Sequence, residues 1–436
     1  MDVNRKAAYF VLLDVEVKKS YSNIALNNRK FRGKLTSPAF AVELVYGVLE
    51  NKMLLDYIID QIVPTGSEKM KESDRIVLRM GIYQLEFMNS VPEYAAVNET
   101  VELAKRFCKG REGFINASLR TYIREKDGIN LPDRGGNEVG YLSIKYSYEP
   151  WIIEMWLEQY SDKEFVEELL KAGNRRPGFV IRANWLKIMR DDLIKRIEAV
   201  GCTVEKGKLY DDALYVQNAH MLIDSKMFKQ GLFSIQDEAS MLVAAMLDPQ
   251  HGDVVMDVCA APGGKTMALA ERMNNKGRII ASDIYIRKLG LINKEAQRLG
   301  IKIVETKTWD ATKVDPAMVE KADRVLVDAP CSGLGVIRRK PEIKYKKKTP
   351  EMDNLPAKQL HILSASSRYV KPGGVLVYST CTINSDENQK VTAEFLKNNP
   401  SFTKEDVIQL MPNVNGTDGF FICKMKKAEP TIGINV

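Results

Sequence analysis

The spacing of apolar residues divides the chain into three regions. Over residues 1–130, apolar residues recur at intervals of three and four, which predicts amphipathic helices. These helices are expected at residues 7–17, 39–49, 53–63, 74–87 and 95–108. Short breaks that contain Pro or Gly separate them, so we expect an all-helical bundle. The Gly-, Asn- and Asp-rich stretch 127–140 predicts a linker.

The other two regions, 141–230 and 231–436, have different patterns. The first mixes helical periodicity with two short β-type runs at 178–185 and 213–216, which predicts a small α+β module. The second alternates strands and helices, so we expect an α/β, Rossmann-like fold with a parallel sheet and helices on both faces. Its strands are expected at 254–256, 279–281, 301–304, 325–327 and 375–378. Ligands of such folds bind beyond the carboxyl ends of the strands.

Composition excludes several classes of protein. The chain has six cysteines without C-x-x-C spacing and three isolated histidines, so we expect neither a disulfide framework nor a metal site. It contains no apolar run of about 18 residues and begins without a signal peptide, so we expect a cytoplasmic protein without a membrane span. The net charge of +7 permits an anionic partner but does not establish one.

The first strand of the third region leads into the sequence DVCAAPGGKT, residues 257–266. Its two adjacent glycines let the backbone approach a ligand closely at the start of a helix. The segment ends like a phosphate-binding P-loop, but Cys259 stands where that motif needs its first glycine. The dinucleotide pattern G-x-G-x-x-G is absent as well. We therefore expect a ligand that needs no phosphate cradle.

Acidic residues follow the next two predicted strands. Asp283 ends the second strand, where an acid commonly binds ribose hydroxyls in this fold class, and Asp310 follows the third. A single aspartate is more often a helix cap or a solvated loop residue. Three carboxylates after successive strands, beginning with Asp257, favour a nucleoside-bearing ligand. S-adenosylmethionine fits best because it carries no phosphate.

Cysteines follow the fourth and fifth predicted strands. Cys331 lies in DAPCSG (328–333) and Cys381 in YSTCT (378–382). A lone cysteine is usually buried and inert. Two cysteines at the ends of neighbouring strands, however, are expected to converge on one pocket.

A thiol beside a methyl donor suits methylation of carbon 5 of a pyrimidine. That carbon is a weak nucleophile, but thiolate addition at C6 turns the ring into an enamine whose C5 attacks a methyl sulfonium. Because an ordinary thiol has a pKa of about 8.5, the site must stabilise the thiolate or deprotonate the thiol on attack. An acid near N3 of the ring, such as Asp328, would assist the addition by hydrogen bonding or proton transfer. Spacing alone does not decide which cysteine is the nucleophile.

Together these segments resemble the NOL1/NOP2/Sun family of RNA cytosine-C5 methyltransferases. The resemblance rests on residues 257–266, 328–335 and 378–382, with further similarity at 236–240 and 418–422. It implies that Cys381 is the nucleophile and that Cys331 promotes release of the methylated product. It also implies that S-adenosylmethionine is bound by a loop and three acids: Cys259, Ala260, Ala261, Pro262, Gly263, Gly264, Lys265, Asp283, Asp310 and Asp328.

A cluster of positive charge follows Cys331. Residues 338–348 (RRKPEIKYKKK) include seven basic residues and one acidic residue. A solvated loop would also explain the cluster, but beside a pyrimidine-modifying site we favour binding to RNA phosphates. The family carries a similar Arg-Arg-Lys-Pro stretch. The expected RNA-binding residues are Arg338, Arg339, Lys340, Lys344 and Lys346.

The first two regions extend the resemblance. With NASLR at 116–120 the helical region resembles NusB-like RNA-binding domains, and with RAN at 182–184 the middle region resembles the small RNA-recognition-like insert of the family. This combination implies a cytosine in small-subunit (16S) rRNA as the target. Further basic clusters at 29–34 and 105–124 are equally compatible with ordinary helix surface.

We therefore predict three domains: a NusB-like domain (1–130), an RNA-recognition-like module (141–230) and a catalytic domain (231–436). Two alternatives to an rRNA methyltransferase stay open. One is a tRNA cytosine-C5 methyltransferase, which the helical domain disfavours. The other is a non-enzymatic RNA-binding assembly or antitermination factor, which the complete set of acids and cysteines disfavours.

Overall fold

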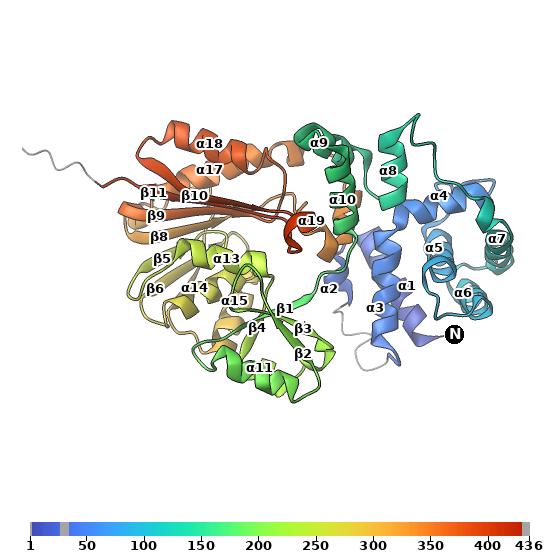
Figure 1. Ribbon diagram of the computed structural model, residues 1–436, viewed down its shortest axis with the longest axis horizontal. Coiled ribbons are helices and arrows are strands. Elements are labelled where there is room, and N and C mark those ends of the chain that lie inside the picture. Colours follow the sequence, from blue (N-terminus) through green and yellow to red (C-terminus); the bar gives the residue numbers. More distant parts are fainter. Residues whose placement is uncertain (1, 27–34, 430–436) are drawn as a thin grey trace, which may run out of the picture. The chain divides into compact units, whose positions relative to one another are not determined.

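The computed structural model describes residues 2–26 and 35–429, and the basic cluster at 29–34 lies outside them. The chain forms two compact units, and each is described by itself. Unit 1 comprises Met1–Arg175 and Ile337–Lys347, and unit 2 comprises Arg176–Val336 and Lys348–Val436. Figure 1 labels the elements of both units.

Unit 1 is helical, as the apolar spacing predicted. Its helices are α1 (Val3–Lys18), α2 (Ser22–Leu26), α3 (Pro38–Glu50), α4 (Lys52–Ile62), α5 (Glu72–Phe87), α6 (Glu93–Phe107), α7 (Glu112–Glu125), α8 (Glu138–Tyr146), α9 (Pro150–Tyr160) and α10 (Lys163–Gly173). The five helices expected before residue 110 are confirmed as α1, α3, α4, α5 and α6. Helix α8 begins within the stretch predicted as a linker, because Asn137 caps its N-terminus by accepting from the backbone N–H of Gly140.

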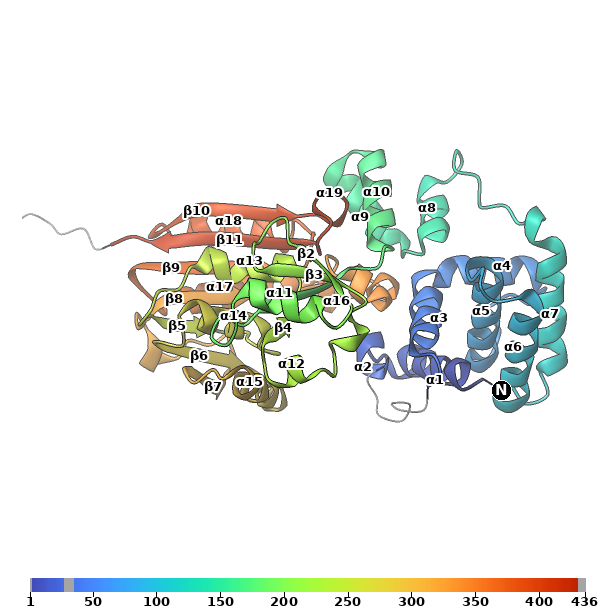
Figure 2. The same ribbon diagram turned by 60° about the horizontal axis from the view of Figure 1, so that its bottom comes forward.

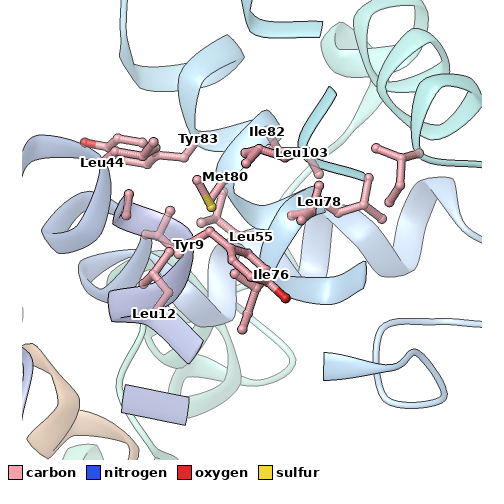
Figure 3. Close-up of a cluster of buried hydrophobic side chains, with 14 of the residues drawn as sticks. Tyr9, Leu12, Leu44, Leu55, Ile76, Leu78, Met80, Ile82, Tyr83 and Leu103 are labelled. Atoms are coloured by element: carbon pink, nitrogen blue, oxygen red, sulfur yellow. The ribbon is translucent and has the colours of Figure 1, made fainter. Parts of the chain in front are cut away.

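The core of unit 1 is built around α5. Ile76, Leu78, Met80 and Ile82 are all at most 1% exposed, so this helix is buried on several sides rather than along a single stripe. Figure 3 shows these side chains packed together with residues of α1, α3, α4 and α6. In Figure 2, α5, α6 and α7 lie side by side. The observed packing is that of a helical bundle.

The first part of unit 2 is a four-stranded antiparallel sheet with the order β2-β3-β1-β4. Its strands are β1 (Phe179–Ala183), β2 (Thr203–Lys206), β3 (Ala213–Gln217) and β4 (Phe233–Ile235), and it carries α11 (Arg190–Glu198) and the short α12 (Lys226–Lys229). Leu193 and Ile197 of α11 pack on Ile181 and Leu214 of the sheet. This is the small α+β module predicted from the mixed pattern, without α9 and α10, which belong to unit 1.

The second part of unit 2 is a seven-stranded sheet with the order β10-β11-β9-β8-β5-β6-β7. Its strands are β5 (Val254–Asp257), β6 (Arg278–Asp283), β7 (Val304–Thr308), β8 (Ala322–Asp328), β9 (Val370–Thr380), β10 (Phe402–Leu410) and β11 (Phe420–Lys427). Strands β5 to β9 pair in parallel, and the chain reverses direction across the sheet between β5 and β8. This reversal is the switch point at which ligands bind in open α/β sheets.

The prediction of a parallel sheet is wrong at one edge. Strand β11 pairs antiparallel with both β9 and β10. Only the short α19 (Pro412–Asn415) separates β10 from β11, and that connection is too short for a parallel crossover. The third strand also begins later than expected, because Ile301 is buried ahead of β7 instead of pairing in it.

Helices cover both faces of this sheet, as predicted. They are α13 (Glu238–Leu247), α14 (Gly264–Arg272), α15 (Ile286–Leu299), α16 (Pro350–Asp353), α17 (Leu355–Ser367) and α18 (Gln389–Asn398). Alternate strand residues separate the two cores: Val255 packs with α13, α14 and α15, whereas Met256 packs with α17 and α18. Across the described ranges, none of the helices is long and apolar enough to span a bilayer.

Candidate active site

A cavity of about 370 Å³ lies in unit 2 at the carboxyl ends of β5, β6, β8 and β9. Its volume is in the range of small-molecule sites. Seven of the residues predicted from the motifs line it: Cys259, Ala261, Asp283, Asp310, Asp328, Cys331 and Cys381. The remaining predicted loop residues do not line it: Ala260, Pro262 and Gly263 precede α14, and Gly264 and Lys265 begin that helix. The motifs that are far apart in the sequence therefore meet at one place.

The loop after β5 turns at a glycine that no other residue replaces easily. Gly263 has a φ of +110°, and a Cβ there would lie 3.2 Å from the side chain of Ile292 on α15. Helix α14 begins at the next residue, so its unpaired backbone N–H groups lie at the end of the loop. Ala260 donates its N–H to the carbonyl of Ser282, which ties the loop to β6.

Asp257 lies beneath this loop and is 1% exposed. The hydroxyl of Thr266 donates to its Oδ2 at 2.7 Å, while Oδ1 has no hydrogen-bond partner among the described residues. Burial raises the pKa of Asp257 to about 7. An orphaned carboxyl oxygen at the end of β5, just before the loop, is the kind of group that a polar ligand satisfies.

Asp283 and Asp310 lie on the same wall of the cavity, at the ends of β6 and β7. Asp283 accepts from the backbone N–H of Tyr285 at 2.9 Å and Asp310 accepts from the hydroxyl of Thr312 at 2.7 Å. The Thr312 hydroxyl and N–H lower the pKa of Asp310, so its carboxylate is available as an acceptor at neutral pH. Two acceptor carboxylates beside one cavity fit the hydroxyl and amino groups of a nucleoside.

Asp328 connects the cofactor loop with the strand that carries Cys381. Its Oδ2 is 2.7 Å from Nζ of Lys265, and its Oδ1 accepts from the hydroxyl of Ser379 at 2.9 Å. Burial opposes the charge on Lys265, but the carboxylate of Asp328 outweighs it and raises the pKa of Lys265. The ammonium also lies 5.0 Å from the ring centre of Phe420, a distance that allows a cation–π contact.

The two cysteines are in contact. Their Sγ atoms are 3.4 Å apart, because β8 and β9 are parallel neighbours and Asp328 pairs with Ser379 just before each strand ends. The hydrogen bond with Cys381, together with burial, raises the pKa of Cys331 well above its usual value. Cys331 is therefore a protonated thiol beside Cys381. The other four cysteines lack such a partner; of these, Cys108, Cys202 and Cys423 are buried among apolar residues.

Sequence reasoning missed much of the cavity wall. Tyr285 and Trp309 line it next to the two acids, and Lys288 on α15 places its ammonium 4.5 Å from the Tyr285 ring centre. Their neighbours Asp283 and Asp310 were the available signal. Lys358 and Ile362 come from α17, whose helical pattern carries no chemical motif.

A second cavity, of about 250 Å³, shares Val258, Trp309 and Ala311 with the first. Neither Cys331 nor Cys381 reaches it. Its charged side chains neutralise one another, since Arg278 pairs with Glu305 and Lys307 pairs with Asp315. We therefore assign the chemistry to the cavity that contains the cysteines.

The basic segment after Cys331 enters unit 1, and its lysines have different surroundings. Lys344 is fully buried: its ammonium donates to the carbonyls of Glu50 and Tyr146 and to Oδ1 of Asn174, at 2.7, 3.0 and 2.7 Å. Burial lowers the pKa of Lys344 to about 7. Its ammonium thus donates hydrogen bonds to acceptors in the interior of unit 1. Lys346 is exposed, and Arg338, Arg339 and Lys340 are half-buried.

Within residues 2–26 and 35–429 we find no group of three or more His, Cys, Asp or Glu side chains placed to hold a metal ion. The acids of the cavity are instead spread over separate strand ends. Their arrangement suits an organic ligand with several polar groups.

Comparison with known proteins gives three matching family models. They are "16S rRNA methyltransferase RsmB/F" over residues 244–426, "NusB family" over 2–124 and "Methyltr_RsmF/B-like, ferredoxin-like domain" over 148–222. A probable ribosomal RNA small subunit methyltransferase B of Bacillus subtilis is 38% identical, over 97% of this chain and 98% of its own.

Two solved structures are also similar. A chain titled PH0851 superposes with a TM-score of 0.81 at 26% identity, covering 98% of each chain. NSun6 from Pyrococcus horikoshii, solved with SFG, has a TM-score of 0.58 at 25% identity, covering 64% of this chain and 98% of its own.

Proposed function

Because the chain belongs to the 16S rRNA methyltransferase RsmB/F family, we propose that it methylates carbon 5 of a cytosine in small-subunit rRNA. The membership confirms the resemblance inferred from the motifs. One observation carries the choice of carbon 5: two thiols lie 3.4 Å apart in a cavity that is also lined by three aspartates at strand ends. Methylation of an amino group needs no thiol, whereas methylation at C5 needs a nucleophile at C6.

The residues of the cavity fit S-adenosylmethionine. Asp283 and Asp310 offer carboxylate oxygens for its hydroxyl and amino groups, and Cys259 and Ala261 form the adjoining wall. Gly263 turns the same loop, and Asp257, whose Oδ1 is orphaned, ends β5 just before it. When bound, this cofactor supplies an electrophilic methyl group.

Cys381 is the proposed nucleophile. Its thiolate adds to C6 of the cytosine, which makes C5 nucleophilic toward the methyl group. After C5 has gained the methyl group, a base takes the C5 proton, and the electron pair of that C–H bond expels the thiolate from C6. The negative charge of a Cys381 thiolate contributes to the raised pKa of Lys265. The Lys265 ammonium therefore stabilises that thiolate in turn. Asp328, held by Lys265 and Ser379, lines the same cavity, and we propose that its carboxylate assists the addition by accepting from a protonated N3 or from the amino group of the ring.

Cys331 is the proposed product-release thiol. Its raised pKa keeps it protonated in contact with Cys381, so it is a source of a proton for the departing thiolate. The cytosine must leave its stack to reach thiols that line a cavity. We propose that Arg338, Arg339, Lys340 and Lys346 bind the RNA backbone. The ammonium of Lys344 is buried and therefore does not reach RNA phosphates.

Bisulfite sequencing of small-subunit rRNA tests this function directly. RNA from cells that lack the protein is incubated with the purified full chain and S-adenosylmethionine, and one cytosine should become resistant to conversion. Cys381→Ala should abolish the signal, while Cys331→Ala should accumulate a covalent protein–RNA complex that is stable in denaturing gels. Cys202→Ala removes a buried thiol of the small module and should leave methylation intact. Full activity of Cys381→Ala would refute the assignment.

A further inference from the structure

A buried carboxylate joins the two loops that carry the cysteines. Glu387 follows Cys381 and precedes α18, and it is 1% exposed. It does not line the cavity. A carboxylate is costly to bury unless its oxygens are hydrogen-bonded, so its partners indicate what it holds in place.

One oxygen of Glu387 holds the Cys331 loop. Its Oε2 accepts from the backbone N–H of Ser332 at 2.8 Å and from Nε2 of Gln359 at 2.9 Å. The same amide group of Gln359 donates to the carbonyl of Pro330 at 3.0 Å. The residues on both sides of Cys331 are therefore fixed by this pair, and Gln359 on α17 is itself fully buried.

The other oxygen faces the strand end that carries Cys381. Asn384 donates to Oε1 at 3.2 Å, and the hydroxyl of Thr382 lies 3.5 Å from it. That hydroxyl is 2.8 Å from the hydroxyl of Ser332, so the residues that directly follow the two cysteines are also joined to each other.

The next residue, Asn388, forms hydrogen bonds with the residues on both sides of Cys381. Its Oδ1 accepts from the hydroxyl of Thr380 at 2.5 Å, and its Nδ2 donates to the carbonyl of Thr382 at 3.0 Å. Backbone bonds add to this network, since the N–H of Gly335 donates to the carbonyl of Cys381 at 3.0 Å. The network leaves each cysteine little freedom to move relative to the other.

We propose that Glu387 is a positioning residue that sets the separation of the Cys331 and Cys381 thiols, so that both reach the same substrate ring. An ionised carboxylate accepts on both oxygens and donates on neither, which suits it to joining two loops that present donors. Its consequence for catalysis rests on the proposed function, because only a reaction that uses both thiols in turn needs them at a fixed distance.

The separation of the thiols can be measured without RNA or cofactor. The oxidant diamide joins two neighbouring thiols in a disulfide by taking two protons and two electrons, and is itself reduced to a hydrazine. In the reduced full-length protein, formation of the Cys331–Cys381 disulfide is followed by peptide mass spectrometry. Wild type should form it readily, since the sulfur atoms are already in contact.

Glu387→Gln and Glu387→Ala should slow this disulfide formation, the second by about tenfold or more, because misplacing reacting groups by about 1 Å costs up to roughly a hundredfold. Glu238→Gln is the matched control: Glu238 is equally buried in unit 2, and it accepts from the N–H groups of Leu209 and Tyr210 instead of holding a cysteine loop. It should form the disulfide at the wild-type rate. If Glu387→Ala does not fold, as judged by its thermal transition, the glutamine variant alone decides.

Disulfide formation at the wild-type rate in Glu387→Gln and in folded Glu387→Ala would overturn the proposal. In the methylation assay, Glu387→Gln should lower kcat while leaving the Kd for S-adenosylmethionine unchanged, because Glu387 is outside the cavity. Failure of wild type to methylate cytosine would refute the proposed function but not the control of thiol separation. The two hypotheses therefore fail in different experiments.

Discussion

At the scale of single residues, Asp257 occupies a motif position although burying its carboxyl group lowers the stability of the fold at neutral pH. It is buried at the end of β5, and only one of its oxygens is hydrogen-bonded within the described structure. Its pKa, about 7 in the folded state, lies well above the ordinary aspartate value of 3.8. The folded protein thus binds a proton that the unfolded chain releases as pH rises between these two values.

We therefore expect Asp257→Asn to become more stable than wild type as pH rises. At about pH 2.5, below both pKa values, both states of wild type hold the proton and the two proteins should be similar. Between about pH 4 and pH 7 wild type loses stability. At pH 8 the free energy of unfolding of the variant should exceed that of wild type by roughly 2–4 kcal/mol, since one pKa unit corresponds to about 1.4 kcal/mol. Urea unfolding of both proteins at a series of pH values measures the difference. A difference that does not change with pH would contradict this account.

Other residues show how much of the candidate site could be predicted from the sequence. Asp283, Asp328, Cys331 and Cys381 could be placed in one cavity because strand-end positions converge in any parallel α/β sheet. The partners of these residues could not be placed in the same way. Glu387 was not predicted to join the two cysteine loops, because its contacts depend on the conformation of two turns and not on a spacing.

At the scale of elements, the segment 337–347 behaves as part of the helical unit although it follows the Cys331 loop in sequence. Lys344 explains why. Glu50 and Tyr146 are the last residues of α3 and α8, so the ammonium satisfies a carbonyl at each of two helix C-termini, where unpaired carbonyls and the helix dipole favour a cation. In the sequence this lysine is indistinguishable from its basic neighbours.

Lys344→Met should loosen this segment and destabilise unit 1. Methionine preserves most of the volume but leaves three buried acceptors without a donor, which should cost roughly 2–5 kcal/mol. Urea unfolding measures the loss, and limited proteolysis should show earlier cleavage within 337–347. Lys347→Met, at an exposed position of the same segment, is the control and should behave like wild type. Equal stability of both variants would contradict the capping role.

Among the strands, the antiparallel edge formed by β10 and β11 escaped prediction for a physical reason. Strand β10 reads FTKEDVIQL, whose middle positions are polar because it lies at the edge of the sheet and several of its side chains are exposed. A search for buried apolar runs detects central parallel strands and passes over such an edge. The central strands β5, β6, β8 and β9 were predicted correctly because both of their faces are buried.

At the scale of the whole molecule, the chain passes between its two units more than once. It leaves unit 1 at Arg175, returns at Ile337 and enters unit 2 again at Lys348. The short second passage carries most of the basic segment, which begins seven residues after Cys331 in the sequence. The chain therefore connects a charged segment of the helical unit directly to the loop of a proposed catalytic thiol. If RNA contacts this segment, removing a charge from it should change the affinity of the whole protein for RNA.

The salt dependence of RNA binding tests this arrangement. Lys346 is exposed in the basic segment, whereas Lys276 is exposed just before β6, at the amino end of the strands and hence at the edge of the sheet opposite the cavity. If Lys346 neutralises one phosphate, Lys346→Gln should weaken binding of small-subunit rRNA and lower the slope of log K against log salt by about 0.7–0.9. Lys276→Gln removes the same charge and should leave that slope unchanged. The net charge of +7 falls by one in both variants. Equal salt slopes for the two variants would mean that only the overall charge matters. A lower slope for Lys346→Gln alone would place the RNA on the basic segment.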